Sequence, residues 1–314
     1  MTIFRPLVSI AVITYNQKTL LKDCLDSCFA QSYQNIEIIV ADDSSTDATR
    51  DLLTYYKDIS PFAFDVYIGS ENRGVAANCN RAWKACRGEW IKTIAGDDKL
   101  EPNCIEIFIN HISKDEPKAD LYFSHMICEE SGDRVYCDVN FYGLSNKDKI
   151  TSLCNENAAM LAPTSFIRKS ILHKVGYADE RFPMIEDYPL WLTFLKKNAT
   201  IKFIDQCTVR YRKSTGITFS KNPSITASYL ASVIGFQKSV LWPEYKGFQN
   251  LKIVDDLVFY IINLSILRLF LLIRLNFSLR TKNIVLFLSP YYLSRLLTKM
   301  LSRKLRAKFG SFGH

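Results

Sequence analysis

Short apolar runs alternate with helical patterns through the first hundred residues of this 314-residue chain. The run over residues 7–13, LVSIAVI, predicts a buried strand, and apolar positions spaced over residues 20–29 predict a helix after it. Residues 36–40 predict a second strand, which a polar turn connects to a second helix through Leu52 and Leu53. Neighbouring parallel strands need a crossover long enough for a helix, so this order predicts an α/β fold with a parallel sheet.

Polar residues cluster where the predicted strands end. These clusters occupy residues 14–16, 42–47, 72–74 and 97–98. In open parallel sheets, ligands bind beyond the carboxyl ends of the strands, so we expect the clusters to meet on one rim. An aromatic ring can stack on a base, and carboxylates can accept hydrogen bonds from base or ribose or bind a metal ion that bridges a diphosphate. The rim therefore predicts a nucleotide site.

The stretch WIKTIAGDDKL, residues 90–100, ends its apolar run at Gly96 and then presents two adjacent carboxylates, Asp97 and Asp98. Adjacent carboxylates repel each other, and a hard divalent cation such as Mg2+ or Mn2+ would relieve that repulsion while binding substrate phosphates. The alternative is a loop in which Asp97 only opens a turn or caps the next helix. The neighbouring polar clusters favour the cation.

Length and composition limit the class of protein. A chain with 48% hydrophobic residues can bury a large core, which argues against a disordered protein. Nine cysteines without a CxxC pair predict reduced thiols in a cytosolic protein, and the first apolar run is too short for a secretion signal. The four histidines show no ligand spacing, so we expect no zinc site.

Five motifs follow one another along the chain: VSIAVITYN, EIIVADDSSTD, ENRGVAANCNRAW, AGDDKL and MIEDYPLW. Together they resemble the family-2 glycosyltransferases of the GT-A fold, over residues 6–212. The resemblance implies a mixed, mostly parallel sheet flanked by helices, which we expect to form an α/β domain over residues 1–220. The character of the sequence changes after this domain, and we expect a C-terminal helical extension over residues 221–314. The resemblance further implies an inverting glycosyltransferase that uses a nucleotide sugar, commonly a UDP-sugar.

The resemblance also implies roles for single residues. Tyr15 would stack on the base, and Asp43 would contact the base or the ribose. Asp98 would be the direct ligand of Mn2+ or Mg2+, with Asp97 beside it as a second metal-binding carboxylate. The residues implied in donor nucleotide binding are Thr14, Tyr15, Asn16, Asp43, Arg73, Asp97 and Arg212.

Two departures from the family pattern affect this site. Many relatives have an acidic residue two positions before the first aspartate of the pair, where this chain has Ala95. The metal ion would therefore have fewer protein carboxylates. An arginine that faces the pyrophosphate in relatives is replaced by Cys79, and Arg73 and Arg81 are the alternatives for its charge.

The motif MIEDYPLW contains the residues expected to act on the acceptor. Inverting transfer needs a carboxylate that takes the proton of the acceptor hydroxyl, and the resemblance implies this catalytic role for Asp187, with support from Glu186. The alternative is that Asp187 only caps the helix that contains Pro189 in its first turn. Trp191 is a candidate for lining the acceptor pocket, although we favour packing in the core.

The net charge of +8 comes from the C-terminal tail. From Leu257 to His314 there are ten lysines and arginines and no acidic residue. Two strongly apolar stretches, 257–275 and 284–301, carry several of these charges, which disfavours a spanning helix. Helices lying on an anionic cytoplasmic leaflet fit this pattern, and so does a packed helical core or a dimer interface. We favour a peripheral membrane contact, with the protein in the cytoplasm at the inner face of the cell membrane.

These observations predict a metal-dependent glycosyltransferase that moves a hexosyl or N-acetylhexosaminyl group to a hydroxyl of a saccharide or lipid-linked saccharide acceptor. Membrane contact would suit polysaccharide synthesis, such as that of O-antigen or capsule. The alternative, from another class, is a non-catalytic nucleotide-sugar-binding or scaffold protein that keeps the fold. A nucleic-acid partner is not expected, because only the charge of the tail favours one.

Overall fold

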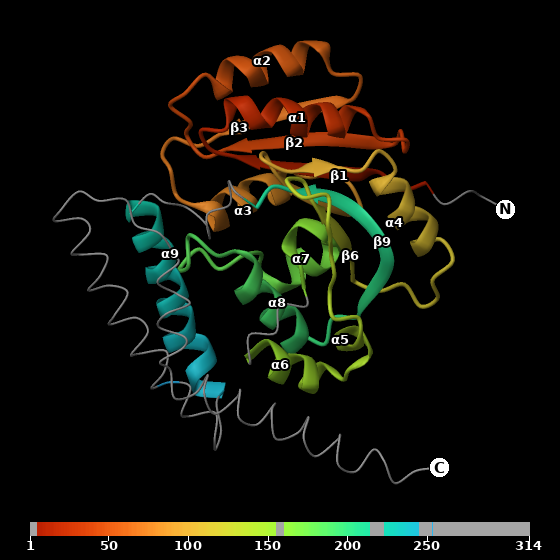
Figure 1. The fold of residues 1–314 in the computed structure, drawn as a ribbon, viewed down its shortest axis with the longest axis vertical. Coiled ribbons are helices and arrows are strands. Elements are labelled where there is room, and N and C mark those ends of the chain that lie inside the picture. The colour runs from red at the N-terminus through yellow and green to blue at the C-terminus, as the bar shows by residue number, and fades with distance from the viewer. Residues whose placement is uncertain (1–4, 155–159, 214–222, 245–252, 254–314) are drawn as a thin grey trace, which may run out of the picture. The chain divides into compact units, whose positions relative to one another are not determined.

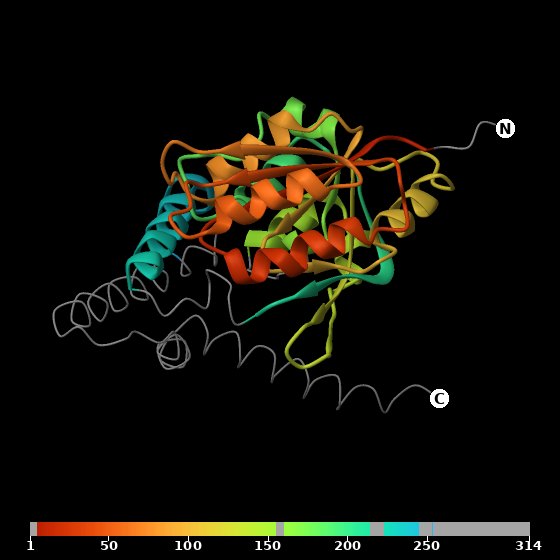
Figure 2. The same ribbon diagram turned by 90° about the horizontal axis from the view of Figure 1, so that it is seen from above.

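The computed structural model of the chain describes residues 5–154, 160–213, 223–244 and 253 (Figures 1 and 2). The chain divides into two compact units, residues 1–216 and residues 217–314. The domain limits expected from the sequence, 1–220 and 221–314, stay a prediction.

The first unit alternates strands and helices along most of its length. Its elements in chain order are β1 (Val8–Thr14), α1 (Lys18–Phe29), β2 (Ile36–Asp42), α2 (Thr49–Ile59), β3 (Ala63–Ile68), α3 (Val75–Ala85), β4 (Trp90–Ala95), β5 (Lys99–Leu100), α4 (Cys104–Ile112), β6 (Leu121–Cys128), β7 (Arg134–Val135), α5 (Asn140–Gly143), α6 (Asn146–Cys154), η1 (Ala162–Thr164), β8 (Phe166–Arg168), α7 (Lys169–Val175), α8 (Asp187–Lys196) and β9 (Ile201–Tyr211).

Nine strands form one sheet in the order β3-β2-β1-β4-β8-β6-β9-β5, with β7 paired to β6 outside this path. Strands β1 to β4 are parallel neighbours, and Val8 of β1 lies opposite both Ile36 and Trp90. Strand β8 is antiparallel to β4 and β6, whereas β6 and β9 are parallel. The sheet is therefore mixed and mostly parallel, as the resemblance implied.

Alternate side chains of the central strands enter different hydrophobic layers. In β2, Ile38 and Val40 belong to the layer packed by α1, α2 and α4, and Ile39 and Ala41 belong to the layer packed by α3, α7 and α8. Figure 1 shows α1 and α2 on one side of β1 to β3 and α3 on the other. Because helices cover both faces, the central strands are apolar in both directions, which is typical of parallel sheets.

Strand β9 is longer than the local pattern predicts. The apolar residues predict a strand over 201–203, whereas β9 continues to Tyr211. Its pairing with β6 shifts register, since Ser124 lies opposite Ile204 and His125 lies opposite Cys207. Such an irregularity interrupts the period-two alternation by which a strand is recognised in a sequence. The extra length brings the residue after β9, Arg212, to the rim of the sheet.

The nine cysteines are all free thiols, and seven of them are buried. Cys24 and Cys28 of α1, for example, pack in the hydrophobic layer between this helix and the sheet. Reduced thiols stay a prediction, with which this arrangement agrees.

The described part of the second unit contains α9 (Pro223–Phe236), a short π-helix (Gln237–Leu241) and a 3-10 turn (Trp242–Glu244). Among the residues that the structure describes, no helix combines the length and the apolarity needed to cross a membrane. The tail for which we expect membrane contact lies outside the described residues.

Candidate functional site

The carboxyl ends of β1, β2 and β4 lie side by side at one edge of the sheet. The backbone N–H of Asp43 donates to the carbonyl oxygen of Thr14 (3.0 Å), and that of Gly96 donates to the carbonyl oxygen of Ile13 (2.8 Å). These bonds continue the parallel ladders beyond the ends of the strands. The first residues after each strand therefore lie next to one another. The structure thus brings three of the predicted polar clusters onto one rim.

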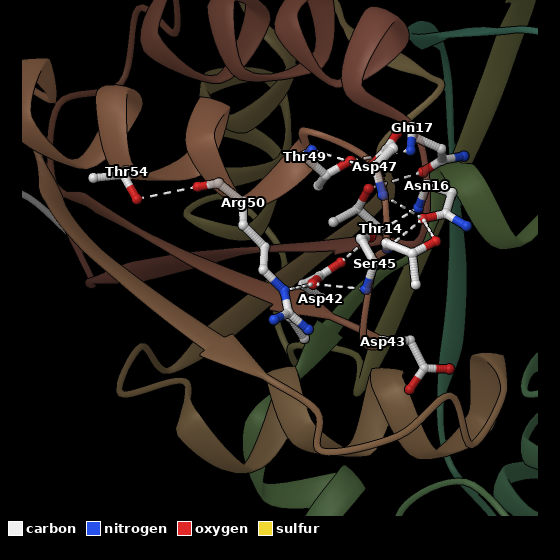
Figure 3. A network of polar contacts seen from close by, with 12 residues as sticks. Thr14, Asn16, Gln17, Asp42, Asp43, Ser45, Asp47, Thr49, Arg50 and Thr54 are labelled. Atoms are coloured by element: carbon white, nitrogen blue, oxygen red, sulfur yellow. Dashed lines mark hydrogen bonds and ion pairs between the residues drawn. The ribbon is translucent and has the colours of Figure 1, made fainter.

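Asn16 joins the segment after β1 to the segment after β2 (Figure 3). Its Oδ1 accepts hydrogen bonds from the backbone N–H groups of Thr46 (2.8 Å) and Asp47 (3.3 Å). Its own backbone N–H donates to Ser45 Oγ (2.8 Å), and Ser45 in turn donates to the fully buried carboxylate of Asp42. The side chain of Asn16 therefore fixes the shape of the rim.

Tyr15 presents an aromatic side chain that is 41% exposed. Thr14 before it is buried, and its Oγ1 donates to Gln17 Oε1 (3.2 Å). Of the three predicted donor-binding residues after β1, Tyr15 has an exposed side chain, while those of Thr14 and Asn16 make hydrogen bonds within the chain.

Asp43 organises the turn before α3. Its buried carboxylate accepts the backbone N–H groups of Arg73 (3.1 Å) and Gly74 (2.7 Å). Gly74 has a φ of +89°, which glycine adopts without strain. The guanidinium of Arg81 lies 3.5 Å from Asp43, whereas the guanidinium of Arg73 pairs with Glu180 (2.8 Å). Of the two arginines that the sequence left open, Arg81 is the one whose side chain reaches Asp43.

Asp97 and Asp98 are both buried, with 6% and 2% of their surface exposed. The backbone N–H of Arg212 donates to Asp98 Oδ1 (2.8 Å), and its guanidinium pairs with Asp23 (2.5 Å). Burial, followed by the negative charge of Asp97, raises the pKa of Asp98 to about 8. The structure therefore brings the predicted residue Arg212 into contact with the predicted metal pair.

This pair of carboxylates fits a hard divalent cation. Their charges repel each other away from solvent, and a cation beside them would lower the pKa of Asp98. Carboxylate oxygens are ligands that Mn2+ and Mg2+ prefer, and such ions keep positions for water and phosphate. No group of three or more His, Cys, Asp or Glu side chains in the described part of the chain is arranged to hold a metal. Asp97 and Asp98 are the residues that would hold such an ion, and the metal ligands stay a prediction.

Glu186 and Asp187 lie at the start of α8, which begins two residues before Pro189. Asp187 Oδ1 accepts the backbone N–H of Tyr188 (2.7 Å), whereas the Glu186 side chain makes no capping bond. Burial, followed by the charge of Asp187, raises the pKa of Glu186 to about 8, and burial also raises the pKa of Asp187. Raised pKa values are typical of carboxylates that exchange protons in catalysis. The contact with Tyr188 is compatible with that role, because it uses one oxygen of Asp187.

Cys79 of α3 packs in the hydrophobic layer between this helix and the sheet. Its thiol is fully buried, and its pKa is raised by burial and then by the negative charges of Glu186, Asp187 and Asp43. The backbone N–H of Gly74, directly before α3, binds Asp43 (2.7 Å), and that of Ala76 in α3 donates to the carbonyl oxygen of Pro183 (3.1 Å). The structure therefore connects the segment before the predicted catalytic pair to the turn that holds the predicted base-binding aspartate.

Trp191 is 3% exposed and packs in the core. Its ring centroid lies 5.2 Å from that of Phe123 and 5.8 Å from that of Phe194. The indole Nε1 is buried and has no hydrogen-bond partner among the described residues. This position agrees with the packing alternative that the sequence favoured.

Sequence reasoning misses Asn78, a buried amide in the middle of α3. Its Nδ2 donates to the carbonyl oxygens of Ala41 (2.9 Å) and Thr14 (3.3 Å), at the ends of β2 and β1. Asparagine is a poor helix former, so its place inside a helical pattern is the signal that identifies it as a residue with a tertiary contact.

Sequence reasoning also misses Lys92 of β4, which has no exposed surface. Its Nζ donates to three backbone carbonyl oxygens, two of them in the segment before β8. Its positive charge acts on Asp98 and lowers the pKa of that carboxyl, against the larger effect of burial. Lys92 shares one face of the strand with Trp90 and Ile94, because side chains two residues apart point to the same side. The sequence pattern therefore already places a cation on an apolar face.

Residues 9–176, more than half of the chain, match the sequence model described as glycosyl transferase family 2. An uncharacterized glycosyltransferase of Rickettsia prowazekii is 31% identical over 199 residues, which are 63% of this chain and 61% of that protein. The chain thus spans less than two thirds of the length of this relative. The putative teichuronic acid biosynthesis glycosyltransferase TuaG of Bacillus subtilis is 27% identical over 212 residues, which are 68% of this chain and 81% of TuaG.

Solved structures share the fold. The crystal structure of S. aureus TarS 1-349 in complex with UDP has a TM-score of 0.56 and 18% sequence identity, and the match covers 81% of this chain and 80% of that chain. The complex of the same protein with UDP-GlcNAc has a TM-score of 0.54 and 18% identity, and covers 81% of each chain. The likeness confirms the mixed α/β sheet flanked by helices.

We expect the free energy of unfolding of the metal-free protein to fall as the pH rises from about 4 to 8, in part through Asp98. A carboxyl whose pKa is raised by folding stabilises the protein at low pH, and this stabilisation is lost as the pH rises through the folded pKa. Asp98→Asn should make the decrease of the unfolding free energy with pH smaller by up to about 1.4 kcal/mol per pH unit, which corresponds to one proton. Urea unfolding in the presence of EDTA at several pH values measures this slope.

The matched control is Asp51→Asn, which changes an exposed carboxyl in α2 and should leave the slope as in the wild type. Equal slopes for wild-type and Asp98→Asn protein would contradict the prediction.

Proposed function

We propose that this chain, which belongs to glycosyl transferase family 2, moves a sugar from a UDP-sugar to a hydroxyl group of a saccharide by an inverting, metal-dependent reaction. The observation that supports this most strongly is the meeting of the strand ends at one rim of the sheet. Backbone hydrogen bonds hold together the segments after β1, β2 and β4, which carry Tyr15, Asp43 and the buried Asp97–Asp98 pair, and Ala76 of α3 binds the segment that leads to the second acidic pair. Each of these parts meets one requirement of sugar transfer.

Tyr15 and Asp43 form the nucleotide end of the proposed site. The ring of Tyr15 would stack on the base, and Asp43 would accept a hydrogen bond from the base or the ribose. Two backbone N–H groups already orient the Asp43 carboxylate, so little ordering is needed when the donor binds. S. aureus TarS, which shares the fold, was crystallised with UDP and with UDP-GlcNAc. This supports a UDP-sugar that carries a hexosyl or N-acetylhexosaminyl group.

Asp98, with Asp97 beside it, would hold Mn2+ or Mg2+ at the diphosphate end. When bound, such an ion supplies positive charge that stabilises the departing diphosphate. The backbone N–H of Arg212 orients the Asp98 carboxylate, and burial keeps bulk water away from it. These contacts prepare the carboxylate without occupying all of its lone pairs.

Asp187 would act on the acceptor as a general base. Its carboxylate takes the proton of the acceptor hydroxyl as that oxygen attacks the anomeric carbon. The bond between this carbon and the diphosphate breaks on the opposite side, the nucleotide leaves with the electron pair, and the configuration inverts. Glu186, with its pKa near 8, holds a proton at neutral pH and so adds no second negative charge beside Asp187.

The proposed acceptor is a saccharide or a lipid-linked saccharide in the synthesis of a surface polysaccharide such as O-antigen or capsule. The name of TuaG, a teichuronic acid biosynthesis glycosyltransferase, supports a polysaccharide acceptor. A lipid-linked acceptor would be reached from the membrane surface, which fits the basic tail.

We expect UDP to raise the melting temperature of the protein, and to raise it more in the presence of Mn2+. A ligand that binds only the folded state stabilises it by about 2.7 kcal/mol at a hundred times its Kd. Asp98→Ala should lose the part of the shift that depends on Mn2+. Thermal-shift measurements with UDP, GDP, CMP and dTDP, each with and without Mn2+, test this, and no shift with any nucleotide would overturn the donor assignment.

Asp187→Asn should reduce sugar transfer by about 10²- to 10⁴-fold, which is the usual contribution of a general base, while UDP affinity stays the same. Release of UDP from UDP-sugars in the presence of saccharide acceptors measures transfer, and calorimetry measures affinity. The exposed control Asp51→Asn should behave as the wild type. A wild-type protein that binds UDP but transfers no sugar would favour the non-catalytic binding protein.

We also propose that the basic tail holds the protein at the inner face of the cell membrane. Each lysine or arginine near an anionic surface contributes about 1 kcal/mol, and the effect is screened by salt. We therefore expect the full chain to sediment with vesicles that contain phosphatidylglycerol and not with vesicles of phosphatidylcholine alone. Changing Arg303, Lys304, Arg306 and Lys308 together to glutamine should weaken binding at least tenfold. Equal binding of wild-type protein to both kinds of vesicle would contradict the proposal.

A further inference from the structure

The segment between α7 and α8, residues 176–186, ends at Glu186, directly before Asp187 at the start of α8, and is attached to α3 at its beginning. Asn80 of α3 makes two hydrogen bonds with Ala178: Nδ2 donates to its carbonyl oxygen (2.9 Å) and Oδ1 accepts from its N–H (2.9 Å). The same Nδ2 also donates to Glu180 Oε1 (2.9 Å). A single buried amide therefore holds two positions of the segment.

Glu180 is held from a second direction. Its Oε2 accepts a hydrogen bond from the Arg73 guanidinium (2.8 Å), and Arg73 is the residue whose backbone N–H binds the carboxylate of Asp43. Glu180 thus bridges Asn80 on α3 and Arg73 in the turn that Asp43 organises.

A third contact lies between Gly74 and Pro183. The carbonyl oxygen of Pro183 accepts the backbone N–H of Ala76 (3.1 Å), and a Cβ added to Gly74 would lie 2.5 Å from that oxygen. The N–H of Gly74 itself binds Asp43 (2.7 Å). The turn that holds Asp43 therefore touches the segment only three residues before Glu186.

Beside α8 the segment borders a surface pocket, although Ala178 itself packs in the hydrophobic layer that includes Leu190 of α8. The pocket of about 430 Å³ is lined by the start of the segment, by Asn80 and Lys84 of α3, and by Pro189, Leu190 and Thr193 of α8. The polar contacts to α3 and to the turn before it thus act together with the burial of Phe182 and Ile185 in holding the segment.

We propose that the junction of Arg73, Glu180 and Asn80 positions the acidic pair and couples it to the nucleotide site. This inference rests on the proposed function, because it takes Asp43 as part of the donor site. A nucleotide that contacts Asp43 orders the turn at 73–74, and the turn orders the segment that ends at Asp187. Glu180 is a positioning residue, which touches no substrate.

The geometry points to a role in positioning rather than in stability. The side chains of Arg73 and Glu180 are 54% and 35% exposed, and ion pairs this exposed contribute little to folding. Asn80 is unsuitable for the test, because its removal leaves two buried backbone groups of Ala178 without partners and endangers the fold. Glu180 is the residue to change.

The experiment follows amide hydrogen exchange of residues 177–188 by mass spectrometry, in the full chain, with and without UDP and Mn2+. In the wild type we expect the nucleotide to slow exchange of this segment at least threefold. Glu180→Ala, which removes both bridges, should abolish the protection by UDP, and Glu180→Gln, which keeps an acceptor for Asn80, should reduce it. Melting temperatures within a few degrees of the wild type show that the variants fold.

The matched control is Arg181→Ala, which breaks the exposed ion pair of Arg181 with Asp179 in the same segment and leaves the contacts to α3 in place. It should keep the wild-type protection. If UDP raises the melting temperature of the wild type but leaves exchange of the segment unchanged, the coupling is wrong and the donor site stands. Full protection in Glu180→Ala would likewise overturn it. If no nucleotide binds, the proposed function fails and the coupling fails with it.

Discussion

The parallel pairing of β1 with β2 and β4 is the constraint on which the site depends. The ladders place Ala11 opposite Ile39 on one side and Thr93 on the other, and all three strands run in the same direction. Their carboxyl ends therefore reach one rim, where residues separated by more than eighty positions become neighbours. A shift of one residue in either ladder would exchange the two apolar faces and remove this alignment, so the hydrophobic layers enforce the geometry of the rim.

Several buried carboxylates lie at that rim, and they differ in how far neighbouring groups compensate their negative charge. The carboxylate of Asp43 is satisfied by backbone N–H groups and by Arg81, and that of Asp42 by Ser45 and by Arg50 at 3.6 Å. Asp98 receives one backbone N–H and the distant charge of Lys92, and its pKa remains raised. An incompletely compensated carboxylate is the place where a bound cation stabilises most.

Helix α3 connects the two halves of the site through three consecutive side chains. Asn78 binds the ends of β1 and β2, Cys79 packs in the hydrophobic layer against the sheet, and Asn80 holds the segment that leads to α8. Two of these are poor helix formers, so their presence in the helix costs stability that the tertiary contacts offset. The donor side and the acceptor side of a sugar transfer would thus share one rigid element, which keeps their separation fixed.

The sequence by itself determined the strands and helices of the parallel half, the polar clusters at the strand ends and the acidic start of α8. Hydrophobic periodicity and turn residues are local features of the sequence. The packing of the strands and helices into the two hydrophobic layers follows the same periodicity. The tertiary structure decided that the side chain of Arg81, and not that of Arg73, reaches Asp43. It also decided that Trp191 is buried and that Arg212 meets Asp98 at the end of a strand with shifted register. These outcomes depend on contacts between residues as far apart as Asp98 and Arg212, and no local period of the sequence encodes a contact across such a distance.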